Sequence, residues 1–461
     1  MPENTLPDTL DQADRLELRR RIDLLVRTGQ LLVESMANTS RIVRDMKRVA
    51  AYLGIPEDKL HIYVNFDMLM VNVSDGSHSF SKFQSIDRHT VNMEAITEIS
   101  LLSWRAIEQD YSLEQFDREL ESIRTRKRNY SHAMVAIGAG FACGGFCIQF
   151  GCDWVAFFYA SLAAMFGMWM RTWCNQAGIN SYIGIAVAAF ASTLLAWASS
   201  YLPSGWTETP WHPLIACALF IVPGVPLMNF VDDMISGYTQ IGTVRAINTL
   251  LIVFAMAFGI AFAVRLSDVD NFFPSISIVP HHQYWEYAIA AGISAIGFSM
   301  IFNIQRRLLW VVALGGIIAV CTRNYVNLGP STDNIGLDMG LVAGSFAGAA
   351  MISIIAIKAV HWFHVPNHVL TIPSAIPMIP GVLMYRMLLG LISNHGASPE
   401  QVTPIMKAVD NGITSGLVIL SIVLGVALPT IIGRKFLDRE KNRQLEELIR
   451  ERKASGRYFS W

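Results

Sequence analysis

The sequence predicts an all-α membrane protein: ten transmembrane helices in a 5+5 inverted repeat, preceded by a small N-terminal α/β cytosolic domain. Three observations predict this class: a charge-poor middle, ten apolar runs and a repeated proline-glycine phrase. Of the 461 residues, 52% are hydrophobic and 16% are charged, whereas globular proteins carry about 25% charge. The 36 basic and 37 acidic residues lie mostly in 1–131 and 434–461. The middle is therefore expected in the bilayer and both ends in water.

Residues 1–131 are expected to form the cytosolic α/β domain. Apolar residues at helical spacing predict two helices between 15 and 54, and helical spacing returns over 87–124. Alternation from His61 to Val73 predicts one half-buried strand, with a turn at 74–77 and a short return strand near Phe80. This domain shows no nucleophile elbow, no glycine-rich phosphate loop and no metal-ligand spacing. A structural or regulatory role is favoured over a hydrolytic one.

The middle of the chain supplies ten candidate spans, since a bilayer-spanning helix needs about 20 apolar residues. The seventh candidate is short and the ninth is interrupted by prolines. The candidates are 132–150, 154–173, 181–201, 211–230 and 245–264, then 284–303, 308–321, 337–357, 368–392 and 411–433. We expect two five-helix membrane units, 132–265 and 266–433, and a cytosolic amphipathic tail, 434–461.

Basic residues set the predicted orientation, because cytoplasmic loops carry an excess of Lys and Arg. Arg171, Arg245, Arg306 and Lys358 fall on the side of the basic stretch 124–128, whereas the connection around Trp206 has no Lys or Arg. Both termini are therefore predicted to be cytoplasmic. No cationic segment followed by an apolar run opens the chain, so no cleavable signal peptide is expected. The net charge of −1 gives no sign of nucleic-acid binding, and the six cysteines are expected to be small buried hydrophobes.

A phrase occurs twice, each time on the fourth span of a group of five. The first copy runs from Ile221 through Pro223-Gly224 to Met228, and the second runs from Met378 through Pro380-Gly381 to Met384. Five is odd, so the second group crosses the membrane in the opposite sense. That arrangement is the inverted-topology repeat of many secondary transporters.

Proline removes a backbone donor and clashes with the preceding turn, so both fourth spans are predicted to be broken helices. Free backbone groups at membrane depth survive where they line a cavity, and helix N-termini favour anions such as a substrate carboxylate. Packing kinks are the alternative. The predicted substrate-binding residues are Pro223, Gly224, Asn229, Pro380, Gly381, Tyr385 and Arg386.

An acid pair, Asp232-Asp233, follows the first phrase. Adjacent carboxylates repel, so beside apolar protein one of them can hold a proton at neutral pH. The pair is either a proton-coupling site or a solvated loop. His361, His364 and His368, near Lys358, are interpreted as interfacial loop residues, with a proton relay as the alternative.

The sequence resembles the threonine/serine exporter family of bacterial inner-membrane transporters. Three passages carry the resemblance: Gly29 to Ser35 continuing to Arg41 and Met46, Pro223 through Asp232-Asp233 to Gly242, and Ile376 through Pro380-Gly381 to Tyr385. Met36 replaces the small residue usual after Glu34-Ser35. The resemblance implies a cytoplasmic N-terminal domain, fused five-span units and export of threonine and serine driven by the proton-motive force. Split members of the group are associated with succinate export.

The predicted function is therefore secondary export of a small carboxylate-bearing solute, with the proton as coupling ion. The alternatives are a dicarboxylate (succinate) exporter, a membrane-bound hydrolase using the cytosolic domain, and a channel or scaffold without coupling. No GxxxxGK[ST] motif is present, which argues against an ATP-driven pump in one chain. We expect no cofactor, metal or catalytic residue, a bilayer as surroundings, and a possible homo-oligomer.

Overall fold

The computed structural model describes residues 12–74, 79–199, 201, 206–267, 282–330, 335–393 and 402–454. The chain divides into two compact units. The N-terminal unit comprises 1–127, 236–241 and 437–461, and the membrane unit comprises 128–235 and 242–436. The short segment 236–241, which includes the first residues of a long membrane helix, is thus grouped with the N-terminal unit.

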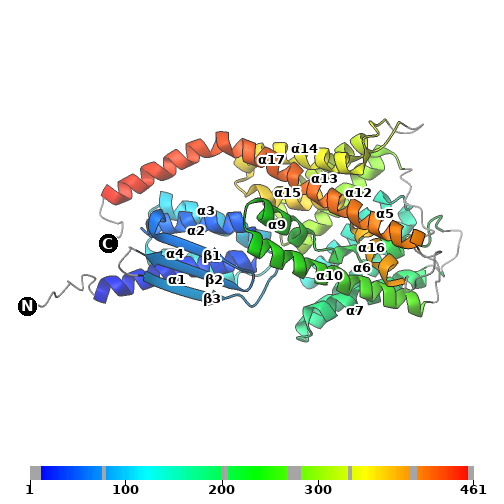
Figure 1. Ribbon diagram of the computed structural model, residues 1–461, viewed down its shortest axis with the longest axis horizontal. Coiled ribbons are helices and arrows are strands. Elements are labelled where there is room, and N and C mark those ends of the chain that lie inside the picture. The colour runs from blue at the N-terminus through cyan, green and yellow to red at the C-terminus, as the bar shows by residue number, and fades with distance from the viewer. Residues whose placement is uncertain are drawn as a thin grey trace, which may run out of the picture. The chain divides into compact units, whose positions relative to one another are not determined.

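The N-terminal unit is an α/β domain with a three-stranded antiparallel sheet in the order β1-β2-β3. Figure 1 shows the strands side by side with α1 along them. Leu18, Leu25 and Leu32 of α1 are fully buried in its core. Its elements are α1 (Gln12–Glu34), α2 (Thr39–Tyr52), the 3-10 turn η1 (Glu57–Lys59), β1 (Leu60–Val64), β2 (Met68–Ser74), β3 (Ser79–Ser85), α3 (Met93–Glu108) and α4 (Leu113–Thr125).

The prediction of one strand from His61 to Val73 is wrong. The segment is a hairpin, because the Asn65 side chain accepts a hydrogen bond from the Phe66 amide (2.7 Å) where the chain turns. The turn also changes which alternate residues face the core: Leu69, Val71 and Val73 are buried in β2. Met68 and Met70 continue the alternating pattern of the earlier residues, but a turn separates them from those residues. The pattern therefore does not mark one face of the sheet. The predicted return strand is β3, and positions 75–77 of the predicted turn lie outside the described residues.

The membrane unit is helical, and each predicted span has a helical counterpart among the described residues. The helices are α5 (His132–Gln149), α6 (Trp154–Gln176), α7 (Ser181–Ser199), α8 (Pro213–Ala216), η2 (Leu219–Ile221), α9 (Gly224–Ile235), α10 (Thr239–Leu266), α12 (Tyr284–Ile301), η3 (Arg306–Leu308), α13 (Leu309–Asn327), α14 (Gly340–Phe363), α15 (Asn367–Ala375), η4 (Ile376–Met378), α16 (Gly381–Ser393) and α17 (Val402–Ala454).

Six of the described helices are long and apolar enough to cross a membrane, or seven if the bent pair α15–α16 counts as one span. The ten-span count stays a prediction. Two lengths differ from expectation. The seventh candidate, expected to be short, continues to Asn327 through polar residues. The last span and the start of the predicted tail form one helix, because α17 runs unbroken from Val402 to Ala454. Pro429 lies inside α17.

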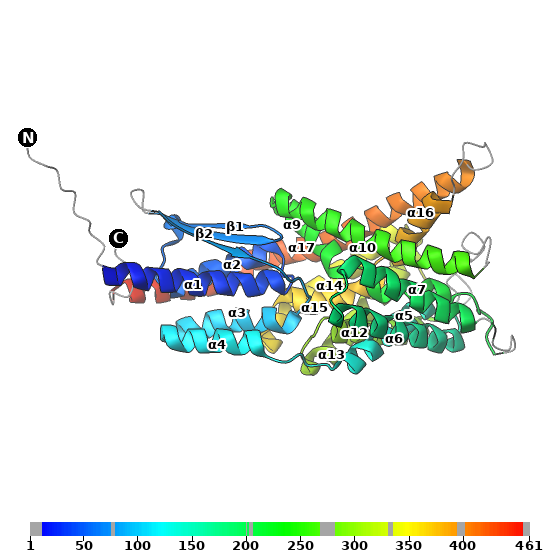
Figure 2. The same cartoon turned by 90° about the horizontal axis from the view of Figure 1, so that it is seen from below.

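Small residues hold α5 and α12 against each other, and Figure 2 shows both beside α6 and α13. A Cβ added at Gly138 would lie 2.9 Å from the Gly297 carbonyl oxygen, and one at Gly145 would lie 2.5 Å from that of Ala290. Because the later residue of α5 meets the earlier residue of α12, the two helices are antiparallel. Each is the first helix of a predicted five-helix group, so the two predicted groups start in opposite directions.

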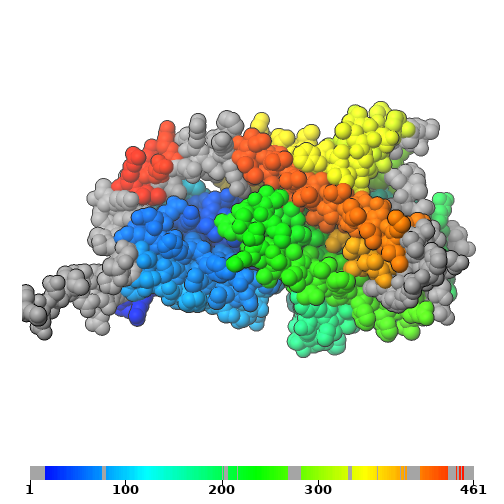
Figure 3. All heavy atoms as spheres, viewed as in Figure 1, coloured from blue at the N-terminus to red at the C-terminus, as the bar shows by residue number. Residues whose placement is uncertain are grey.

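Close packing recurs between α14 and α17, whose surfaces adjoin in Figure 3. A Cβ at Gly425 would lie 2.7 Å from the Phe346 carbonyl oxygen, which explains the glycine. All six cysteines are free; five are buried and Cys321 is partly exposed. Their predicted role as small hydrophobes agrees with these positions.

Candidate functional site

Both proline-glycine phrases interrupt helices, as predicted. In the first group, α8 and η2 end at Ile221, and α9 begins at Gly224. In the second, α15 and η4 end at Met378, and α16 begins at Gly381, with a 60° bend between the two parts. The proline before each glycine cannot donate the hydrogen bond that would continue the helix.

The two breaks have the same backbone hydrogen bonds, 157 positions apart. The Gly224 amide donates to the Val222 carbonyl and the Gly381 amide to that of Ile379, both at 2.8 Å. Each tight turn encloses the proline. The last turn before each break also repeats, since Val222 donates to Leu219 (3.1 Å) and Ile379 donates to Ile376 (2.9 Å). The repeated phrase therefore encodes one local structure, used twice.

The breaks contact each other, and the contact is reciprocal. A Cβ at Gly224 would lie 3.0 Å from the Ile376 side chain, and a Cβ at Gly381 would lie 2.8 Å from that of Leu219. Leu219 and Ile376 are equivalent positions, so each glycine contacts the equivalent side chain of the other break. Such exchange is what a local two-fold relation produces. Side chains around both breaks are buried, so this is a packed crossing.

Polar residues follow each break but differ between the groups. Asn229 of α9 is 3% exposed, and the equivalent position in α16 is Arg386, which is partly buried. The backbone of Tyr385 lies in α16, and its side chain is outside the described set. The structure thus places Pro223, Gly224, Pro380 and Gly381 together at the crossing and the three polar residues on the helices that leave it.

The predicted acid pair divides into two different environments. Asp233 is fully buried, and its Oδ2 accepts a hydrogen bond from Arg245 Nη1 at 2.6 Å. Arg245 is 1% exposed and comes from α10, whereas Asp232 is partly exposed. Sequence reasoning used Arg245 only to assign orientation and missed this ion pair. The sequence signal that could have revealed the pair is an arginine, Arg245, near the start of an apolar helix and twelve residues after Asp233.

The histidine group near Lys358 is spread over a helix end. His364 is exposed and ends α14 in a left-handed conformation, and His368 lies partly buried in α15. The His361 side chain lies outside the described set. Among the described residues, no group of three or more His, Cys, Asp or Glu side chains could hold a metal ion.

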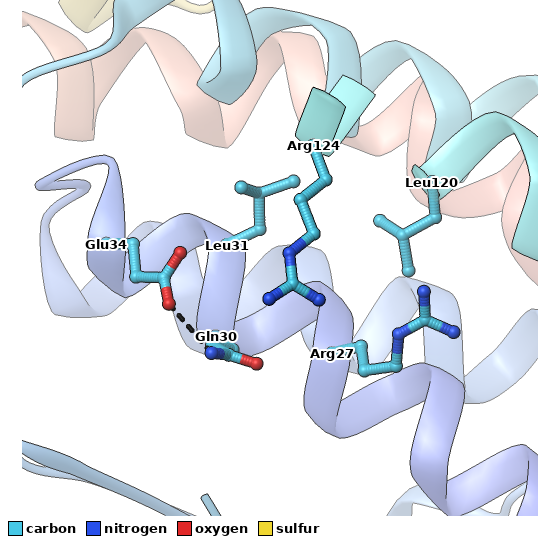
Figure 4. A pocket seen from close by; sticks show the side chains of 6 residues that line it. All are labelled: Arg27, Gln30, Leu31, Glu34, Leu120 and Arg124. Carbon is cyan, nitrogen blue, oxygen red and sulfur yellow. Dashed lines mark hydrogen bonds between the residues drawn. The ribbon is translucent and has the colours of Figure 1, made fainter. Parts of the chain in front are cut away.

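A small hollow in the N-terminal unit lies beside the Gly29 to Ser35 passage. Figure 4 shows Arg27, Gln30 and Glu34 of α1 facing Arg124 of α4, with Leu31 and Leu120 between them. The hollow has a volume of about 10 Å³, which is about the space that one water requires. Arg27 is already paired with Asp117 (2.5 Å) and Glu121 (2.7 Å), so it joins α1 to α4.

An apolar multi-helix unit with two contacting broken helices defines a multi-pass membrane protein of transporter type. A family model of threonine/serine exporters matches residues 23–267, and a second, described as "Threonine/Serine exporter, ThrE", matches 287–432. The chain belongs to the threonine/serine exporter family and is a membrane exporter.

Individual relatives cover the chain in two ways. The "Threonine/serine exporter" of Corynebacterium glutamicum is 18% identical over 89% of this chain and 83% of its own length. The "Probable succinate transporter subunit YjjP" is 26% identical in Escherichia coli, covering 53% of this chain and 93% of the relative. Its Klebsiella aerogenes namesake is 25% identical over 55% and 97%. No solved structure matches the chain.

Proposed function

We propose that this protein is a secondary transporter that exports threonine and serine across the inner membrane, driven by the proton-motive force. The observation that carries the proposal is the reciprocal contact of the two broken helices at Gly224 and Gly381. Secondary transporters bind their solutes where the broken helices of two repeats meet. Both α9 and α16 begin at this crossing, and their first backbone amides, directed along the helix axis, favour an anionic group such as a carboxylate. Asn229, Tyr385 and Arg386 are the side chains proposed to recognise the solute.

The proposal includes ten spans in a 5+5 inverted repeat with both termini cytoplasmic. The antiparallel packing of α5 and α12 and the 157-residue shift between the breaks support it. Alternating access would then be movement of one five-helix group against the other around the crossing.

Within the acid pair, Asp232 is the proposed proton carrier. Asp233 is buried in an ion pair with Arg245, which occupies its carboxylate. Asp232 is partly exposed, so its carboxyl group is accessible. The coupling proposal therefore moves from the pair to its first member, with Asp233 and Arg245 fixing the start of α10 against α9.

Succinate is the second candidate solute. It is favoured by relatives of 25–26% identity named as succinate transporter subunits, above the 18% of the relative named as an amino-acid exporter. Both solute classes carry a carboxylate. A hydrolase in the N-terminal unit has no such support, since the family descriptions name exporters.

The test is transport by the purified full chain in proteoliposomes with labelled threonine, serine and succinate, with and without a pH gradient. We expect accumulation of threonine and serine that collapses when a protonophore removes the gradient. Asp232→Asn should abolish gradient-driven accumulation while solute exchange remains. Accumulation of succinate alone would replace the substrate assignment, and accumulation that ignores the protonophore would refute the coupling.

A further inference from the structure

A second repeated phrase lies on the helix that follows α5 and on the helix that follows α12. Near the end of α6 the chain reads Arg171-Thr172-Trp173-Cys174-Asn175, and near the end of α13 it reads Arg323-Asn324-Tyr325-Val326-Asn327. Arginine, an aromatic residue and asparagine occupy the same three positions in both. The shift is 152 residues, compared with 157 for the proline-glycine phrases.

The structure treats these positions as equivalent. A Cβ at Gly140 of α5 would lie 3.0 Å from the Ser161 carbonyl oxygen of α6. With the same shift, a Cβ at Gly292 of α12 would lie 3.9 Å from that of Ala313 in α13. The third helices also approach the two asparagines: Gly184 of α7 lies near Asn175 and Gly344 of α14 lies near Asn327, although these two glycines are 160 positions apart.

The two arginines turn away from the outer surface of the membrane unit. Trp173 is 52% exposed and Tyr325 is 44% exposed, as aromatic residues at a membrane interface are. Each arginine lies two residues earlier, which is about 200° around an α-helix. Arg171 and Arg323 are partly buried accordingly. This direction is opposite to the one expected of an arginine that extends along the lipid.

Neither arginine has an acidic partner among the described residues. Arg171 makes no hydrogen bond or ion pair with any of them. Arg323 donates only to neutral amide oxygens: Nε and Nη2 to Asn324 Oδ1 at 3.1 and 3.0 Å, and Nη2 to Gln149 Oε1 at 3.5 Å. Partly buried charges in an apolar helix are costly unless a counter-charge arrives.

The arginines lie at opposite ends of α5. Gln176, which ends α6, contacts His132 in the first turn of α5, with 3.1 Å between Nε2 and Nδ1. Arg323 instead contacts Gln149, the last residue of α5. Inverted repeats place equivalent residues on opposite sides of a membrane, so the predicted orientation puts Arg171 at the cytoplasmic end and Arg323 at the outer end.

We propose that Arg171 and Arg323 are two equivalent carboxylate-binding sites, one near each end of α5, which bind the solute before and after it passes the crossing. The inference rests on the proposed export function and extends it. A guanidinium binds a carboxylate through two parallel hydrogen bonds, and lysine cannot reproduce that geometry. Each site therefore predicts sensitivity to an Arg→Lys change.

The experiment measures the half-saturating concentration of serine, threonine and succinate from each face of oriented proteoliposomes. The variants are Arg171→Lys, Arg323→Lys and the control Arg265→Lys, a solvent-exposed arginine at the end of α10. Arg171→Lys should raise the cytoplasmic-face value at least about tenfold and leave the outer-face value near that of the parent. Arg323→Lys should do the reverse, and the control should change neither, because about one strong hydrogen bond is lost per site.

Several outcomes would overturn the proposal. Parental values in both variants would refute the arginine sites and leave the export function intact, whereas a parent that transports none of the three solutes refutes both. The assay is repeated in phosphatidylcholine with and without phosphatidylglycerol. An effect that requires the anionic lipid and is equal at both faces would assign the arginines to lipid phosphates. Size-exclusion profiles of each variant identify any loss caused by misfolding.

Discussion

The two predicted five-helix groups of the membrane unit share the backbone geometry of their helix breaks and differ in the charges around those breaks. Both breaks have the same proline-centred turn, and their glycines are packed in the same way. The first group then places Asp232 and Asp233 on α9, whereas Leu389 and Gly390 occupy those positions in α16. The second group has Arg386 where the first has Asn229. The two groups therefore share the backbone geometry of the crossing, whereas each charged side chain near it occurs in only one of the groups.

The largest expected effect concerns the buried ion pair, which has no counterpart in the second group. Asp233→Asn or Arg245→Gln leaves one charge buried and unpaired, which costs about 3–5 kcal/mol. Thermal unfolding of the purified protein in detergent measures this. The double variant should recover much of the loss, because it buries no charge.

The neighbouring Asp232→Asn serves as the control for that prediction, since Asp232 is partly exposed. It should change the free energy of unfolding by less than about 1 kcal/mol. A similar loss for Asp232→Asn and Asp233→Asn would mean that the ion pair contributes nothing special to stability.

The crossing itself predicts matched effects in the two groups. Gly224→Ala and Gly381→Ala each place a methyl group against the other break, and such overpacking costs about 1–3 kcal/mol. Gly381→Ala should cost slightly more, since its nearest atom would be 2.8 Å away rather than 3.0 Å. Gly416→Ala, in a helix with open space around it, should be neutral or stabilising. If only one crossing variant lost stability, the reciprocal contact would be wrong.

A smaller difference concerns how the second helix of each group begins. Asp153 caps α6, accepting hydrogen bonds from the Ala156 amide, the Thr207 hydroxyl and the Glu208 amide, each at 2.7 Å. At α13 the N-cap is Leu308, which has no side-chain cap. Asp153→Ala should therefore cost about 1 kcal/mol at pH 7, with 0.5–2 as the usual range.

The same carboxylate gives a pH dependence. Burial raises the pKa of Asp153, but the hydrogen bonds that its carboxylate accepts lower the pKa by more, so the net pKa lies below the ordinary value. A lowered folded-state pKa contributes stability above the unfolded-state pKa, about 3.9, and loses it as the pH falls through the folded-state value. The gap between the parent and Asp153→Ala should thus be constant from pH 5 to 7 and shrink below about pH 4. A gap that grows on acidification would contradict the capping role.

Sequence patterns predicted the features that depend on neighbouring residues. Proline at 223 and 380 fixes a helix break locally, so both breaks were predictable, as were the helices around them. The hairpin at Asn65 was missed because alternation continues in sequence across a tight turn while the faces exchange. The length of α13 was underestimated because its last turns contain the polar residues Arg323 and Asn324. The apolar run therefore ends before the helix does.

Pairings between helices could not be predicted from one sequence. The Asp233–Arg245 pair needs a helix end, a turn at Gly237 and a second helix to bring the side chains together. The reciprocal contact at Gly224 and Gly381 needs the packing of two groups. Periodicity reports which residues are buried, but it does not report what they are buried against.

The central claim is the reciprocal crossing, and paired cysteines test it most directly. In a chain without its six native cysteines, Leu219→Cys with Gly381→Cys and Ile376→Cys with Gly224→Cys form two equivalent pairs. Gly416→Cys with Gly224→Cys is the control. Mild oxidation of membranes, read by the mobility of a chain cut between the cysteines, should link both equivalent pairs and not the control. The reason is that a Cβ at Gly381 or Gly224 would lie 2.8 or 3.0 Å from the side chain of Leu219 or Ile376, respectively. Cross-linking of only one equivalent pair, or of neither while thiol reagents show the cysteines to be present and reduced, would contradict the two-fold crossing.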